Sequence, residues 1–158
     1  MKRIVMVFAV VCFSFVCVQS ALPAEKKKGK AAAAVKPSLS DAERAALAQS
    51  ALAQLNAQAW TIKLVQQGAK KPKSEADVLT FSGQGVVSQF LSAKGFGGSQ
   101  FSLSIQDDGS AVWETVQRTE NEDTALWRGE LRGNVLTGTL SIRYKSGMGE
   151  VYSFSTSA

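Results

Sequence analysis

The sequence predicts a mainly β protein: an eight-stranded antiparallel up-and-down barrel preceded by one N-terminal helix. Apolar and polar residues alternate through most of the chain after residue 59, with the period of a half-buried strand. Short sequences rich in Gly, Asn and Asp separate these runs, as in hairpin turns. A capping motif and strong helix formers precede the first run. The predicted segments are a signal peptide (1–24), a basic flexible linker (25–38), an amphipathic helix (39–58) and a β-barrel domain (59–158).

The first segment has the features of an export signal. Two basic residues precede an apolar run, and small residues suited to a signal peptidase follow at Ser20, Ala21 and Ala24. The apolar run is about 15 residues, shorter than the roughly 20 that a spanning helix needs, so a cleaved signal is favoured over an uncleaved anchor. We therefore predict a periplasmic or secreted protein whose mature chain begins between Ala21 and Glu25.

Cysteine and histidine usage limits the chemistry of the mature chain. Both cysteines, Cys12 and Cys17, lie in the predicted signal, and the chain has no histidine. Thiol or imidazole catalysis and zinc sites built on those ligands are therefore excluded after cleavage. The acidic pair Asp107-Asp108 and the acidic cluster in 120–123 lie in predicted turns, without a partner that would shift a carboxyl pKa into the range needed for acid–base catalysis. We predict no catalytic residue, no bound metal and no cofactor.

Positive charge is concentrated before the predicted helix. Five lysines oppose one glutamate in 25–38, whereas 11 basic and 12 acidic residues follow in 39–158. Such a composition is typical of a solvated linker. The alternative role is electrostatic attachment of the Lys26–Lys36 tail to an anionic envelope surface. Nucleic acid is not an expected partner, because no basic face with interleaved aromatic residues follows.

The helix is predicted from its start signal and its apolar stripe. Ser40 and Glu43 have the spacing of a capping box, and strong helix formers continue to about Ala57. The stripe consists of Leu47, Ala48, Ala51, Leu52 and Leu55. We expect it to cover a neighbouring core; a seam between two helices of different copies is the alternative.

Turn positions set the expected register of the sheet. The eight expected strands span 60–67, 76–82, 86–92, 99–106, 111–118, 124–132, 135–144 and 150–156. A two-residue loop at Gly133-Asn134 places Gly129 opposite Gly138, and a five-residue loop at Thr119–Asp123 places Trp113 opposite Gly129. A loop from Lys145 to Gly149 would place Tyr152 near Ile142 and Phe154 near Leu140.

The two faces of this sheet differ in polarity. One face carries the large apolar side chains Trp113, Trp127, Leu131, Leu136, Leu140 and Ile142. The other face carries the charged side chains Lys63, Glu114, Arg118, Arg128, Glu130 and Arg143. Burying the apolar face requires closure into a barrel, which we favour, or collapse into a two-layer sandwich. The charged outer face argues against a membrane-spanning barrel, whose outer face must be apolar.

Several stretches resemble the lipocalin-like, or calycin-like, small exported bacterial β-barrels. The resemblance rests on Trp60, DVLTF at Asp77–Phe81, KGF at Lys94–Phe96, VWETVQ at Val112–Gln117 and WRGELRGNVLTGTL at Trp127–Leu140. The lipocalins proper have glycine two places before the first-strand tryptophan, where this chain has glutamine. The resemblance implies a barrel able to bind a small apolar ligand.

Two functions follow from these residues. If the inward glycines leave room, a small hydrophobic molecule would contact Trp113, Trp127, Gly129 and Gly138 within the barrel or at its mouth, under a lid formed by the loop around Phe96. If a tryptophan ring covers the bare backbone instead, the core is filled, and Phe96 only anchors its loop. The protein would then be a structural or interaction protein of the envelope, or a barrel-type enzyme inhibitor.

Overall fold

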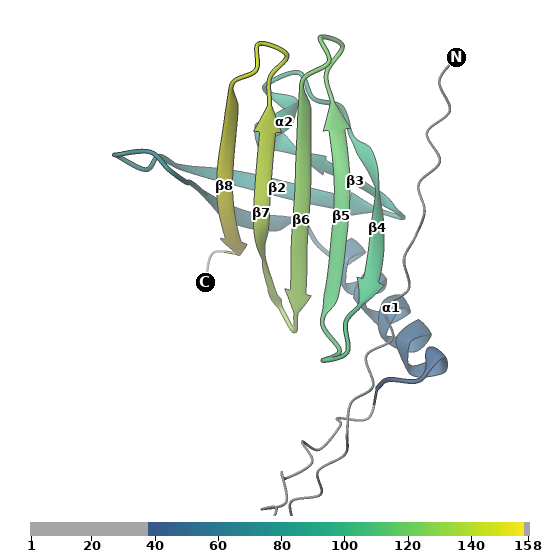
Figure 1. Cartoon of the computed structure of the whole chain (residues 1–158). Helices are drawn as coiled ribbons and strands as arrows, with labels where there is room; N and C mark the ends of the chain where they lie inside the picture. The colour runs from purple at the N-terminus through teal and green to yellow at the C-terminus, as the bar shows by residue number, and fades with distance from the viewer. Residues whose placement is uncertain (1–37, 157–158) are drawn as a thin grey trace, which may run out of the picture. The chain divides into compact units, whose positions relative to one another are not determined.

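A computed structural model of the protein describes residues 38–156, which form a closed antiparallel barrel of eight strands with one helix before the first strand (Figure 1). The predicted fold class is therefore confirmed, and the sandwich alternative is wrong. The predicted signal peptide and all but the last residue of the predicted linker lie outside the described residues. The elements are α1 (Asp41–Asn56), β1 (Trp60–Gln66), β2 (Ser74–Ser82), β3 (Gly85–Ser88), α2 (Gln89–Ser92), β4 (Ser99–Ile105), β5 (Ala111–Arg118), β6 (Thr124–Arg132), β7 (Val135–Arg143) and β8 (Gly149–Thr156).

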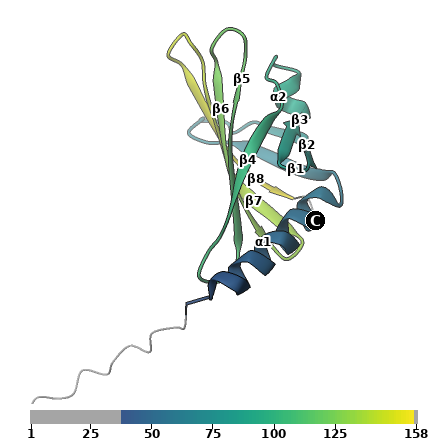
Figure 2. The same cartoon turned by 90° about the vertical axis from the view of Figure 1, so that its right-hand side faces the viewer.

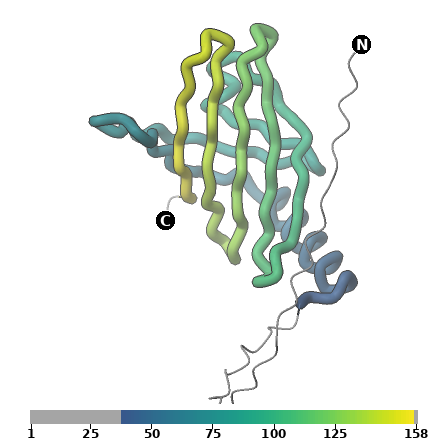
Figure 3. Tube along the Cα trace, viewed as in Figure 1, coloured from purple at the N-terminus to yellow at the C-terminus, as the bar shows by residue number. Residues whose placement is uncertain are grey.

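Strands pair in chain order, and β1 also pairs with β8, which closes the barrel. Figure 3 shows β4–β8 as one curved layer, with β1–β3 crossing behind it. The predicted register is confirmed between β5 and β6 and between β6 and β7: Trp113 faces Gly129, and Gly129 faces Gly138. The two hairpin loops were therefore predicted with the correct lengths.

The predicted pairing of β7 with β8 is wrong by two residues. Leu140 faces Tyr152, and Gly138 faces Phe154. The N–H of Tyr144 donates to the carbonyl of Met148 at 2.9 Å, so pairing continues one residue past each strand end. The loop that this last pair encloses has three residues rather than the predicted five. A shift of two residues keeps each side chain on its expected face, so the interior composition is unchanged.

The predicted strand 86–92 ends early, and its second half is the short helix α2. Side-chain oxygens provide acceptors for the first N–H groups of this helix. The Asp77 carboxylate accepts from the N–H of Phe90 at 2.8 Å, and the Ser88 hydroxyl accepts from the N–H of Leu91 at 3.0 Å. Ser88 also donates to Asp77 at 2.7 Å, and both side chains are buried. This buried polar pair, which the alternation pattern does not reveal, turns the chain out of the sheet.

Helix α1 covers one end of the barrel, as its apolar stripe predicts (Figure 2). It begins at the predicted capping box, in which the N–H of Glu43 donates to the Ser40 hydroxyl and the N–H of Ser40 donates to the Glu43 carboxylate. Of the stripe, Ala51 and Leu55 are buried in the barrel core. Side-chain hydrogen bonds then attach the helix to the turns at this end: Arg44 to the carbonyl of Ile105 (2.8 Å), Gln54 to that of Gly133 (2.6 Å) and Asn56 to that of Gly83 (3.1 Å).

The connection from α2 to β4 covers the barrel on the other side of the core. Leu91 and Phe96 are buried, and the side-chain amide of Gln117 donates to the carbonyl of Gly97 at 2.8 Å. The N–H of Gly97 in turn donates to the carbonyl of Arg118 on β5. Phe96 therefore anchors this loop to the barrel, which is the second of its two predicted roles.

Candidate functional site

The predicted interior site lies where β5, β6, β7 and β8 adjoin. Trp113 and Trp127 are 0% and 1% exposed, and their ring centroids are 6.2 Å apart. The Trp113 ring also packs edge-on against Phe81, at 5.2 Å. The indole N–H of Trp127 donates to the side-chain oxygen of Gln117 at 2.9 Å, so this buried polar group has an acceptor. Four of the five predicted site residues thus adjoin one another, while Phe96 is buried in the connection between α2 and β4.

Aromatic rings fill the space beside the two inward glycines. A Cβ atom on Gly129 would overlap the indole ring of Trp113. A Cβ atom on Gly138 would overlap the backbone of Arg128 and would lie 2.7 Å from Cζ of Phe154. The expectation that a tryptophan covers this wall is therefore correct for Gly129, whereas Gly138 is covered by a phenylalanine from β8.

The Trp113 ring has no water-sized space beside it. An internal cavity wide enough for a water molecule gives accessible surface to the atoms that line it, yet Trp113, Leu136 and Leu140 have none. The indole N–H of Trp113 is buried and has no hydrogen-bond partner among the described residues. Such a group costs folding free energy, and a bound water would remove that cost if there were room for one.

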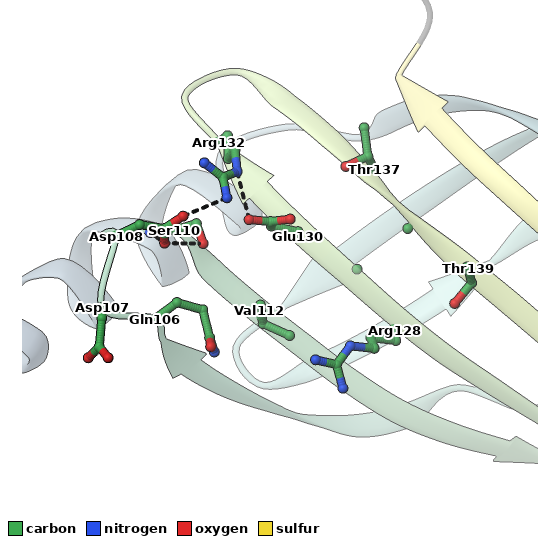
Figure 4. A pocket seen from close by; sticks show the side chains of 12 residues that line it. Gln106, Asp107, Asp108, Ser110, Val112, Arg128, Glu130, Arg132, Thr137 and Thr139 are labelled. Carbon is green, nitrogen blue, oxygen red and sulfur yellow. Dashed lines mark hydrogen bonds and ion pairs between the residues drawn. The ribbon is translucent and has the colours of Figure 1, made fainter. Parts of the chain in front are cut away.

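A hollow lined by several charged side chains lies on the outer face, over the same part of the sheet (Figure 4). Its volume is about 600 Å³, and it is open to solvent. Arg132 donates to Asp108 at 2.6 Å and to Glu130 at 2.7 Å, so one guanidinium is shared by two carboxylates and the group keeps a net charge of −1. Hydrogen bonds from Ser110, and then the Arg132 guanidinium, lower the pKa of the Asp108 carboxyl to about 2. The paired charges belong to the β4–β5 and β6–β7 hairpins and hold these together.

A second cluster joins the only two tyrosines of the chain. The hydroxyl groups of Tyr144 and Tyr152 donate to the same carboxylate oxygen of Glu150, at 2.9 and 3.1 Å. Burial, and then the negative charge of Glu150, raises the pKa of each phenol to about 12. Both tyrosines therefore stay neutral donors at physiological pH. Sequence patterns did not identify this cluster, because whether the two phenols reach one carboxylate depends on side-chain conformation and not on strand pairing alone.

The outer face also carries a row of exposed apolar side chains. Val116 faces Leu126, Leu126 faces Ser141, and Ser141 faces Val151, so the row crosses β5, β6, β7 and β8. Val116, Leu126 and Val151 are between 44% and 50% exposed. The neighbouring rows on either side are polar, with Arg118 and Arg143 on one side. Ser141 separates Val151 from the adjacent pair Val116 and Leu126, so the row offers a small exposed apolar area rather than an unbroken stripe.

The described part of the chain contains no cluster of three acidic or cysteine side chains that could hold a metal ion. None of the described helices has the length and hydropathy needed to cross a membrane. Comparison of the chain with protein-family models, with curated proteins and with solved structures found no match. The resemblance to lipocalin-like barrels therefore stays a prediction.

Proposed function

We propose that this protein is an exported interaction module of the cell envelope: a small β-barrel that is filled by its own side chains and acts through its outer surface. The observation that carries the proposal is the burial of Trp113 and Trp127, which lie against glycine backbone and neighbouring aromatic rings. A barrel that holds a ligand inside needs apolar walls with room between them. Here that room is occupied.

Binding of an apolar ligand at Trp113, Trp127, Gly129, Gly138 and Phe96 stays a prediction. Substitutions of these residues can test it. Such a ligand would have to displace a packed indole ring. The complex would then lose the stabilisation that burial of the ring itself provides. Displacement of this kind costs a large part of the affinity that burial of a small apolar ligand provides. The geometry therefore supports an interaction module with a filled core better than a module that binds a ligand inside the barrel.

The outer surface supports a role in binding a partner rather than in catalysis. Val116, Leu126 and Val151 offer exposed apolar area, and the carboxylates of Asp107 and Asp108, in the turn that precedes β5, are paired with arginines. Attachment to an anionic envelope surface through the Lys26–Lys36 tail is part of the proposal, since five lysines in that segment oppose one carboxylate.

Native mass spectrometry of protein purified from the cells that make it tests the filled interior. We expect the mass of the processed chain alone. A lipid or pigment bound at one molecule per chain would contradict the proposal and support the ligand prediction. The same spectrum tests export, because cleavage between Ala21 and Glu25 gives a chain that lacks the signal, whereas retention of Met1 would contradict export.

A further inference from the structure

The hairpin between β1 and β2 differs in charge from the rest of the barrel. Its loop contains Lys70, Lys71 and Lys73, and no carboxylate lies between Gln67 and Ser74. The rest of the chain from residue 39 onward has eight basic and twelve acidic residues, so it is negative. The barrel is therefore electrically polarised, with its positive end at one hairpin.

Unlike four of the other described cations, the three hairpin lysines form no ion pair within the described residues. Ion pairs join Arg44, Arg128, Arg132 and Lys145 to carboxylates of the barrel, whereas among the described residues no such pair involves Lys70, Lys71 or Lys73. Four residues of extended chain span at most about 14 Å, so neighbouring lysines of the three lie roughly within the Debye length of physiological salt. They repel one another until an external anion neutralises them.

The hairpin projects away from the barrel wall, so its lysines are accessible (Figure 1). β2 pairs with β3 only from Leu79 onward, and β8 pairs with β1 only as far as Gln66. Residues Ser74–Val78 of β2 therefore pair with β1 alone, whereas β1 lies between β2 and β8 along most of its length. Every residue from Gln67 to Ala76 is exposed except Ala69, which is half-buried.

We infer that this lysine hairpin docks the protein on a lipid bilayer that carries anionic headgroups. The inference rests on the proposed envelope location and adds a contact that is separate from the Lys26–Lys36 tail. The negative remainder of the barrel is repelled by the same surface, so the field orients the molecule with the hairpin toward the bilayer.

The composition of the loop favours a bilayer over nucleic acid. The residues from Gly68 to Lys73 include neither an aromatic side chain, on which a base would stack, nor an arginine, which would grip a phosphate with two hydrogen bonds. Lysine is a compact hydrated point charge on a flexible stem, suited to attraction by a diffuse layer of headgroups. Each lysine near such a surface strengthens binding about fivefold.

Co-sedimentation with phosphatidylcholine vesicles, with and without phosphatidylglycerol, tests the inference on the protein purified from its own cells. We compare it with a variant in which Lys70, Lys71 and Lys73 are all changed to Gln. The matched control changes Lys94, Arg118 and Arg143 to Gln, which removes the same net charge from elsewhere on the barrel. Both variants change exposed side chains, and circular dichroism melts check that they fold.

We expect binding only to the anionic vesicles, weakening as salt is added, and about 100-fold weaker for the hairpin variant. The control should lose much less. Repeating the comparison with all tail lysines of residues 26–36 changed to Gln separates the two contacts. The inference would be overturned if the hairpin and control variants lost equal affinity for the vesicles, or if the hairpin variant lost none. It would also be overturned if the hairpin variant lost affinity for dissolved polyphosphate but not for vesicles. The proposal of a filled barrel would not be affected, because native mass spectrometry tests it separately.

Discussion

Trp113 on β5 lies opposite Gly129 on β6, and its indole ring occupies the position that a Cβ atom on Gly129 would need. Because the ring is fully buried, it cannot move toward solvent to make room. The pair shows how the interior is filled: a residue without a side chain accommodates the largest side chain from the neighbouring strand. Changes that add volume here should therefore destabilise the fold.

We predict that Gly129→Ala and Gly138→Val each lower the free energy of unfolding by about 1–3 kcal/mol through overpacking. The loss should occur even though alanine and valine fit strands better than glycine does. The added atoms would meet Trp113 at the first position, and Phe154 and backbone at the second. Urea melts give the measurement.

The matched control for Gly138→Val is Thr137→Val on the adjacent, exposed position of β7. Valine is similar in shape to threonine, so this change should alter stability by less than about 0.5 kcal/mol. If Gly138→Val proves neutral or stabilising while the control is also neutral, the wall is not packed, and the interior has room.

Leu55 makes helix α1 part of the barrel core rather than an addition to it. Leu55 is fully buried, and the indole N–H of Trp60 donates to its carbonyl at 3.1 Å. We predict that Leu55→Ala destabilises the protein by about 2–5 kcal/mol, whereas Leu47→Ala, on the half-buried part of the same helix, costs clearly less. Equal small effects in thermal melts would show that the helix is separable from the barrel.

The two tyrosines should titrate together near pH 12, because both donate to Glu150 and both are partly desolvated. A pKa that is higher in the folded state than in the unfolded state leaves stability intact below about pH 10 and lowers it as pH rises from 10 toward 12. Tyrosinate absorbance measures the titration directly. Glu150→Gln should lower both midpoints, since the negative charge beside the phenols is removed while burial is unchanged; unchanged midpoints would contradict the assigned role of Glu150.

Asp108 should make the free energy of unfolding depend on pH in the acid range. Its folded-state pKa of about 2 lies below the ordinary value of 3.8, so its contribution is present above about pH 4 and is lost as pH falls toward 2. Asp108→Asn should flatten this part of the curve of unfolding free energy against pH. A variant whose curve falls as steeply as that of the unchanged protein would show that other carboxylates cause the loss.

Local patterns in the sequence predicted most of the fold. Alternation assigned Trp113 and Trp127 to the interior, and turn residues gave the register from β5 to β7, because hairpin loop length is encoded by a few adjacent residues. The β7–β8 register could not be predicted, since the glycine pair in 147–149 allows either a three-residue or a five-residue loop. The turn into α2 was also missed, because it depends on Asp77, which is distant in the sequence.

The interior site shows a further limit of sequence patterns. Alternation placed Gly129 and Gly138 inward, but whether a ring or empty space lies beside them depends on side-chain packing from other strands. Phe154 reaches Gly138 only in the observed register, so the predicted pairing of β8 could not reveal it. The Glu150 cluster was missed because strand alternation does not show whether two phenols reach one carboxylate.

The central claim is that the barrel interior is full, and tryptophan fluorescence tests it most directly. All three tryptophans are buried, with Trp60 2% exposed and the other two less. Titration of the folded protein with the apolar dye N-phenyl-1-naphthylamine should give no saturable energy transfer from tryptophan, because no space beside the rings admits the dye. Saturable transfer at one dye per chain, abolished by Gly129→Ala or Gly138→Val, would contradict a filled interior.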